Sequence, residues 1–171
     1  MRWTRLTVIL FAAAASVSAA IAPLAALDTP SAPAPPAAWP PAAVLGRWTG
    51  EGRLGFREGK FETVKCRVTY IADDDKILKQ TVRCATAGAN VEVKSSITEA
   101  SGALSGTWEE TVYNLHGDIS GLTTPKGFRV QVKSDSLNAN MDLIVSDAKQ
   151  VIEIQFFNST LLGLSIALTK G

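Results

Sequence analysis

Histidine and cysteine are scarce in this sequence, which has one histidine, His116, and two cysteines, Cys66 and Cys84. A single histidine excludes metal sites that need two imidazole ligands, and a Ser-His-Asp triad would have to use His116. No G-x-S-x-G motif and no glycine-rich phosphate loop occurs, and the neighbouring Glu109 and Glu110 point to opposite faces of a strand. We therefore expect a protein that is not an enzyme and that holds no metal and no cofactor.

An excess of charge of one sign is also absent. The chain has 17 basic and 16 acidic residues, and removal of Arg2 and Arg5 with a cleaved leader leaves 15 basic residues and a net charge of −1. Charges of the two signs are interspersed, which is typical of a solvated surface. Because nucleic-acid binding needs a basic face, the composition argues against nucleic acid as a partner.

The first 26 residues have the pattern of a secretory signal peptide. Two arginines lie in residues 1–5, residues 6–22 carry no charge and are rich in alanine, and small residues between Ala20 and Ala26 suit signal peptidase. A membrane-spanning helix needs about 20 strongly apolar residues, whereas this run is dominated by alanine. We therefore predict a signal peptide at residues 1–26, no membrane span in the mature form, and a periplasmic or extracellular location.

Residues 27–43 form a segment rich in alanine and proline, with TPSAPAPP at residues 29–36. This composition favours extended polyproline conformations and cannot build a core, so it predicts a disordered linker. Two interpretations stay open: a tether that serves partner capture, and a tail without a role. Trp39 is the aromatic residue of this segment and a candidate for docking on the domain that follows.

Residues 44–171 alternate with a period of two. From Val44 to Phe56 every second residue is apolar or glycine, and Arg47, Thr49 and Glu51 stand between them, as in a half-buried strand. The pattern recurs to the end of the chain, and turn signals such as residues 73–75 and 101–102 separate the runs by roughly ten residues. We predict an all-β domain with about eight to ten strands, folded as one antiparallel up-and-down barrel, with a β-sandwich as the alternative.

The two cysteines are expected to form a disulfide. An exported protein folds where disulfides persist. If residues 73–76 make a hairpin turn, direct cross-strand partners have residue numbers that add to 150, which pairs Cys66 with Cys84, Val68 with Val82, and Tyr70 with Gln80. The bond should therefore lie on the inner face of this hairpin, where a redox role is not expected.

Several polar and aromatic side chains fall on the predicted inner face and are candidates for binding a ligand. They are Trp48, Tyr70, Gln80, Ser95, Trp108 and Glu110. A few polar groups in an apolar cavity are what orients a small ligand. For Glu110 three alternatives stay open: a pocket carboxylate with a catalytic or binding role, a strand bulge that turns it outward, and a place at the wet mouth of the barrel.

The register around His116 and the last strands gives two further expectations. If Val112 is inward and opposite Ile119, then Leu115 and His116 form a hairpin tip. We expect His116 to be a surface residue there, and the alternative is a ligand of haem or of a metal ion. In the C-terminal strands the predicted inward positions include Leu162 and Leu164, with Leu161 outward. These inward residues are bulky enough to fill a narrow barrel, so a filled core remains an alternative to a ligand cup.

Gly46-Arg47-Trp48 on the first strand, followed by antiparallel hairpins, resembles the opening of calycin barrels such as lipocalins and avidins, and Gly106-Thr107-Trp108 repeats the form. The resemblance implies that Trp48 plugs one end of a barrel that holds a small apolar ligand. In lipocalins a late arginine packs on this tryptophan, and the final strand here offers Lys170.

The chain is also similar to periplasmic metalloprotease-inhibitor barrels, which combine export, a Gly-x-Trp strand, one disulfide and a flexible N-terminal segment that enters the protease. That likeness would give the linker an inhibitory role. Our first hypothesis is thus an exported, non-catalytic barrel that binds a small apolar or amphipathic ligand. The alternative is a protein-binding module, either a periplasmic protease inhibitor or an envelope scaffold. The sequence makes no prediction of the oligomeric state.

Overall fold

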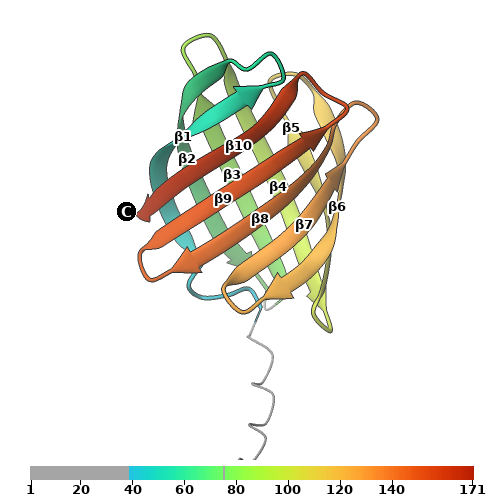
Figure 1. The fold of residues 1–171 in the computed structure, drawn as a ribbon. Coiled ribbons are helices and arrows are strands. Elements are labelled where there is room, and N and C mark those ends of the chain that lie inside the picture. Colours follow the sequence, from blue (N-terminus) through green and yellow to red (C-terminus); the bar gives the residue numbers. More distant parts are fainter. Residues whose placement is uncertain (1–38, 75) are drawn as a thin grey trace, which may run out of the picture. The chain divides into compact units, whose positions relative to one another are not determined.

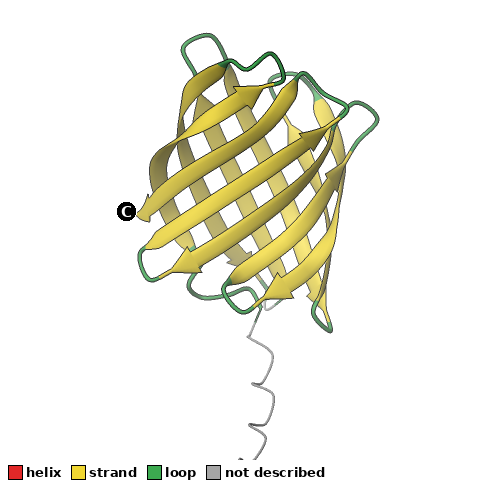
Figure 2. Cartoon of the chain, viewed as in Figure 1, coloured by secondary structure: helices red, strands yellow, loops and turns green. Residues whose placement is uncertain are grey.

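The barrel is seen in a computed structural model that describes residues 39–171 except residue 75. Ten antiparallel strands form a closed up-and-down barrel, in which each strand pairs with its neighbours along the chain and the last strand pairs with the first (Figures 1 and 2). The strands are β1 (Gly46–Phe56), β2 (Phe61–Asp73), β3 (Ile77–Ala85), β4 (Asn90–Ala100), β5 (Ala103–Glu110), β6 (Leu115–Thr124), β7 (Gly127–Lys133), β8 (Asn138–Ser146), β9 (Lys149–Phe157) and β10 (Leu161–Lys170). The predicted barrel is confirmed. The predicted signal peptide and the linker up to residue 38 lie outside the described residues.

Closure of the barrel depends on the pairing of β1 with β10, which runs from Trp48 opposite Lys170 to Phe56 opposite Leu161. Two inward glycines of β1 allow this close approach. A Cβ atom on Gly50 would lie 2.0 Å from the carbonyl oxygen of Ala167, and one on Gly52 would lie 2.1 Å from that of Ser165. Glycine is therefore required where β1 coils against β10, and the closed sheet is left without a free edge.

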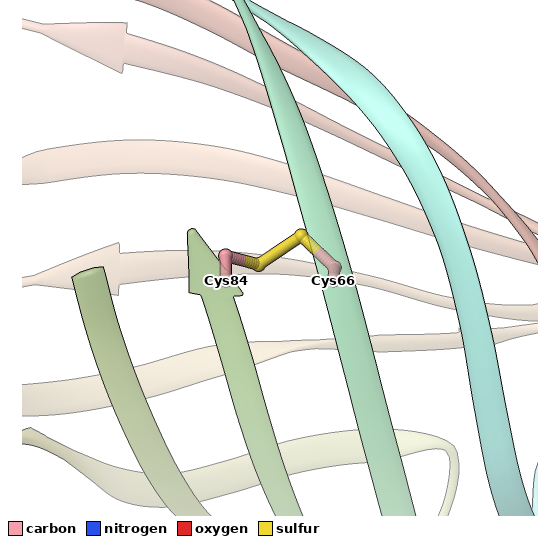
Figure 3. Close-up of a disulfide and its surroundings, with 2 residues drawn as sticks. All are labelled: Cys66 and Cys84. Atoms are coloured by element: carbon pink, nitrogen blue, oxygen red, sulfur yellow. A yellow bond between two sulfur atoms is a disulfide. The ribbon is translucent and has the colours of Figure 1, made fainter. Parts of the chain in front are cut away.

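The disulfide links Cys66 of β2 with Cys84 of β3, as the hairpin register predicts (Figure 3). The two residues are direct cross-strand partners with their Cα atoms 4.2 Å apart, and Tyr70 is paired with Gln80 in the same ladder. Both cysteines are buried in the core. The second hairpin is thus fastened from the inside of the barrel.

One end of the barrel, here called the closed end, is covered by the segment that precedes β1. Val44 is fully buried, and its carbonyl oxygen accepts a hydrogen bond from Nε1 of Trp48 at 2.8 Å. Trp39 contacts the ring of Phe128 edge to face at 6.0 Å, and its Nε1 donates to the carbonyl oxygen of Lys76. Residues 39–45 therefore cap the barrel, although composition assigned most of them to the linker.

The opposite end, here called the open end, carries the turns that follow β1, β3, β5, β7 and β9. Inward apolar side chains near this end pack on the core but keep part of their surface exposed. They are Val82, Val91, Val93, Leu115, Val132, Ile154 and Leu164. Inward residues near the closed end, such as Leu78, Phe128 and Leu143, have no exposed surface. The two ends of the barrel are thus built differently.

Two expected registers are wrong. The turn between β5 and β6 comprises residues 111–114, so Glu110 pairs with Leu115 and Glu109 with His116. Val112 is 54% exposed instead of inward. The chain turns early because Asn114 adopts a left-handed conformation, with a φ of 56°, which asparagine tolerates.

The second wrong register lies at the start of β10, where the pairing with β1 shifts between Gly55 and Phe56. This bulge turns Leu162 outward, where it is 46% exposed, and leaves Leu161 partly buried.

The part of the chain that the structure describes contains no helix long and apolar enough to cross a membrane.

Candidate ligand site

Four of the six predicted site residues lie side by side across neighbouring strands. Tyr70 on β2 pairs with Gln80 on β3, Gln80 pairs with Ser95 on β4, and Ser95 pairs with Trp108 on β5. All four side chains are buried and at inward positions, and Gln150 of β9 joins them from another wall of the barrel. We call these five residues the polar row.

Hydrogen bonds connect four of the five residues of the polar row, all except Trp108. The hydroxyl of Ser95 donates to Oε1 of Gln80 at 2.9 Å, and Nε2 of Gln80 donates to the hydroxyl of Tyr70 at 3.4 Å. The hydroxyl of Tyr70 donates in turn to Oε1 of Gln150 at 3.1 Å. Because strands tilt in a barrel, the row rises from Gln150 near the closed end of β9 to Trp108 near the open end of β5.

The row is electrically neutral. Burial raises the pKa of the Tyr70 phenol well above its ordinary value of 10.0, and this outweighs the opposing effect of its hydrogen bonds to Gln80 and Gln150. Tyr70 therefore keeps its proton at physiological pH and can act as both donor and acceptor. The other members of the row carry groups that do not titrate in this range.

The two ends of the row are donors without partners. Nε1 of Trp108 and Nε2 of Gln150 are buried and make no hydrogen bond to the described part of the chain. Trp108 is 6% exposed and Gln150 is 1% exposed. A buried donor without a partner costs about 1–3 kcal/mol, so each end of the row would gain from an acceptor oxygen.

Trp48, also predicted to bind a ligand, has a structural role at the closed end. It is fully buried and its Nε1 donates to Val44. The ammonium of Lys170 lies 5.3 Å from the centre of its ring and within 3.4 Å of the carbonyl oxygen of Ala43. Lys170 thus packs on the tryptophan where lipocalins use arginine. Trp48 takes no part in the hydrogen bonds of the polar row.

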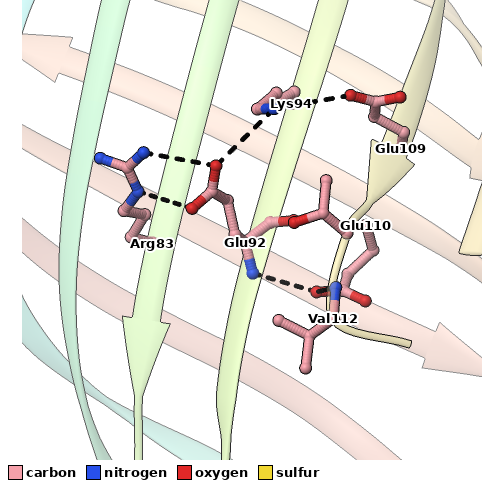
Figure 4. Close-up of polar contacts among 7 residues, drawn as sticks. Arg83, Glu92, Lys94, Glu109, Glu110 and Val112 are labelled. Carbon is pink, nitrogen blue, oxygen red and sulfur yellow. Dashed lines mark hydrogen bonds and ion pairs between the residues drawn. The ribbon is translucent and has the colours of Figure 1, made fainter. Parts of the chain in front are cut away.

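Glu110 lies inward at the open end, but its carboxylate is occupied by the backbone. It accepts hydrogen bonds from the N–H groups of Glu92 and Val112, both at 3.0 Å (Figure 4). A third comes from the N–H group of Tyr113 at 2.6 Å. Burial raises the pKa of Glu110, but these donors outweigh burial and hold the pKa below 4.5. The charged carboxylate therefore stabilises the turn between β5 and β6.

Substituting Glu110 by glutamine is expected to lower the free energy of unfolding by about 1–3 kcal/mol, because the three donors lose a charged acceptor. The wild-type stabilisation is fully present above the unfolded-state pKa and is lost as the pH falls through the lower folded-state pKa. Urea denaturation at about pH 7 and about pH 3.5 should show a smaller pH dependence for Glu110→Gln. Glu109→Gln, at the adjacent outward position, is the control, and equal losses for both variants would contradict this role.

His116 lies within β6 and faces outward, so the prediction that it lies at a hairpin tip is wrong. It pairs with Glu109 and lines a shallow hollow on the outer face of β3 to β7 together with Lys94, Asp118 and Lys133. Nearby, the carboxylate of Glu92 forms an ion pair with the guanidinium of Arg83, and its Oε1 lies 3.9 Å from Nζ of Lys94 (Figure 4). Within the described ranges no group of three potential ligands is placed to hold a metal ion. Mixed charge of this kind is typical of a solvated surface.

Gln150 is the member of the polar row that sequence reasoning missed. It shares the inward parity of Ile152 and Ile154, so extending the period of β9 back by one step would have found it. The turn signal at residues 147–149 led us to start this strand at Val151, whereas β9 begins at Lys149.

No known protein family and no curated protein sequence matches the chain. Among solved structures, the crystal structure of Rv2717c from M. tuberculosis is similar, with a TM-score of 0.62 and 10% identity over 76% of this chain and 94% of that one. The S-type phycobiliprotein lyase CPES from Guillardia theta gives a TM-score of 0.51 and 9% identity over 75% of this chain and 89% of that one. Likeness at such low identity shows the fold alone, and the closed antiparallel barrel fits the calycin-like resemblance of the sequence.

Proposed function

We propose that this chain is an exported, non-catalytic barrel that binds a small apolar or amphipathic molecule through its open end. The observation that carries the proposal is the asymmetry of the barrel. Inward apolar side chains near the open end keep part of their surface exposed, while residues 39–45 cover the other end. Apolar walls with a few buried polar groups are typical of small-molecule sites.

The polar row supplies the few polar groups that such a site needs. It descends from Trp108 near the open end and terminates in donors without partners. A ligand with an apolar body and an acceptor group would bury the exposed valines and leucines and satisfy a donor at the same time. One structural neighbour is named a phycobiliprotein lyase, but one fold hosts many functions, so our proposal rests on the site.

Two features support a non-catalytic role and export. Glu110, the candidate for acid–base chemistry, is engaged by three backbone N–H groups, and His116 lies on the outer face. The disulfide between Cys66 and Cys84 belongs to compartments in which thiols are oxidised. This agrees with the secretory pattern of residues 1–26.

The proposal is tested by placing a charge in the open end. Leu115 and His116 are successive residues of β6 on opposite faces of the sheet. Leu115→Arg should weaken binding of a fluorescent fatty-acid analogue at least roughly tenfold, because an arginine there disrupts the apolar wall. His116→Arg, with the same new charge outside, should leave affinity unchanged.

Circular dichroism of both variants shows whether the barrel is intact. Native mass spectrometry of the protein isolated from its own host is the second measurement, in which we expect a bound small molecule. A consistently empty protein that also binds none of a panel of fatty acids, fatty esters and fatty amides would contradict the proposed function.

A further inference from the structure

We infer that the ligand carries an uncharged hydrogen-bond acceptor, such as the carbonyl oxygen of an ester, amide or ketone, and that Nε1 of Trp108 donates to it. The inference rests on the proposed function and adds the chemical class of the ligand and its main polar contact. It follows from the partner that Trp108 lacks, from its position near the open end, and from the charges around it.

The indole N–H of Trp108 is a donor that the folded chain leaves unused. The side chain is 6% exposed, and Nε1 has no hydrogen-bond partner among the described residues. Trp39 and Trp48, in contrast, both donate through Nε1 to backbone carbonyl oxygens. Buried polar groups in native proteins nearly always have a partner, so this exception points to one from outside the chain.

The two cross-strand neighbours of Trp108 offer its N–H no acceptor side chain. On β6 its cross-strand partner is Gly117, where an added Cβ would lie 2.9 Å from Nε1 and 1.8 Å from the carbonyl oxygen of Lys133. On β4 its partner is Ser95, whose hydroxyl donates to Gln80. Glycine at position 117 thus lets the indole pack closely on the backbone of β6, and neither cross-strand neighbour supplies a side-chain partner for the N–H.

Trp108 is also within reach of a molecule that enters from the open end. It lies one inward position below Glu110, the last residue of β5, and Leu115 and Val93, the cross-strand partners of Glu110, keep exposed surface. Gln150, the other donor without a partner, is the second residue of β9, at the closed end. An entering head group therefore meets Trp108 first.

The charges near Trp108 disfavour an anionic head group. Glu110 is two residues away on the same face of β5, a separation of about 7 Å along the strand, and its carboxylate is held in the ionised form by backbone donors. The basic side chains of β3 and β4, which are Lys79, Arg83 and Lys94, occupy exposed outward positions. A carboxylate bound at Trp108 would be desolvated and would face repulsion without a compensating cation.

The test compares head groups on one twelve-carbon skeleton in the purified full-length protein. Methyl laurate, lauramide, laurate at about pH 8 and dodecane compete with a bound fluorescent dye. We expect the ester and the amide to bind about fivefold or more tightly than dodecane and laurate, since one neutral hydrogen bond corresponds to about that factor. Trp108→Phe should remove this preference and keep the affinity for dodecane. Trp39→Phe, which removes an indole N–H that already has a partner, should preserve the preference.

A spectroscopic measurement identifies the donor. In protein labelled with ¹⁵N, the Nε1–H resonance that Trp108→Phe eliminates should move downfield when methyl laurate binds, whereas the resonance of Trp48 should stay in place. Laurate that binds as well as the ester, or a Trp108 resonance that does not move while the ester binds, overturns the inference and leaves the proposed function standing. If none of the four compounds binds, the proposed function itself fails.

Discussion

Replacing Trp48 by alanine is expected to destabilise the barrel by about 3–5 kcal/mol, the usual cost of removing a large buried aromatic side chain. Trp48 has no exposed surface and lies where the chain before β1, the first strand and the last strand meet. Its removal leaves a cavity at the closed end, deprives the carbonyl oxygen of Val44 of its donor, and takes the aromatic face away from Lys170. Domains of this size are stable by about 5–15 kcal/mol, so the loss is a large part of the total.

Urea denaturation followed by circular dichroism measures this loss without depending on tryptophan fluorescence. Trp48→Phe separates the contributions, because it retains an aromatic ring but loses the hydrogen bond to Val44 and part of the indole volume. We expect that variant to lose about 1–2 kcal/mol. An alanine variant within about 1 kcal/mol of the wild type would show that the closed end repacks without the tryptophan.

The parts of the structure that sequence predicted correctly are those in which a period of two meets a tight turn. The turn after β2 fixes the partners Cys66 and Cys84, and parity then places Tyr70, Gln80 and Ser95 inside the barrel. Side chains alternate strictly along a strand, so one correct register determines every residue of the hairpin. The disulfide, Tyr70 and Gln80 follow from that single register, and the alternation along β4 adds Ser95.

The features that sequence did not predict depend on contacts between distant segments. Val112 and Tyr113 continue an apolar pattern, but the carboxylate of Glu110 binds their N–H groups and ends the strand before them. Trp39 is separated from Phe128 by most of the barrel sequence, so the sequence named it as a candidate for docking but did not give its partner. The bulge that turns Leu162 outward arises from its pairing with β1, at the other end of the domain.

Removing the disulfide is expected to lower the free energy of unfolding by about 3 kcal/mol, the chain-entropy value for a loop of this length. The cysteines are 18 residues apart in sequence and join neighbouring strands. The native ladder holds the two strands together with or without the bond, so the stabilisation comes mainly from restricting the unfolded chain. Cys66→Val/Cys84→Ala, which keeps apolar volume in the core, is the variant of choice.

The burial of the bond leads to a second expectation from the same variant. Cys66 is 3% exposed and Cys84 is 7% exposed on the inner face of the barrel, so a reductant reaches the sulfur atoms only when β2 and β3 open. Native protein should therefore resist dithiothreitol, and reduction should accelerate in sub-denaturing urea. After reduction its denaturation midpoint should fall to that of Cys66→Val/Cys84→Ala, whose own midpoint should not respond to dithiothreitol. Rapid reduction of the folded protein without urea would mean that the hairpin of β2 and β3 opens independently of the rest of the barrel. Tyr70 and Gln80 of the polar row belong to this hairpin, so they would then open with it.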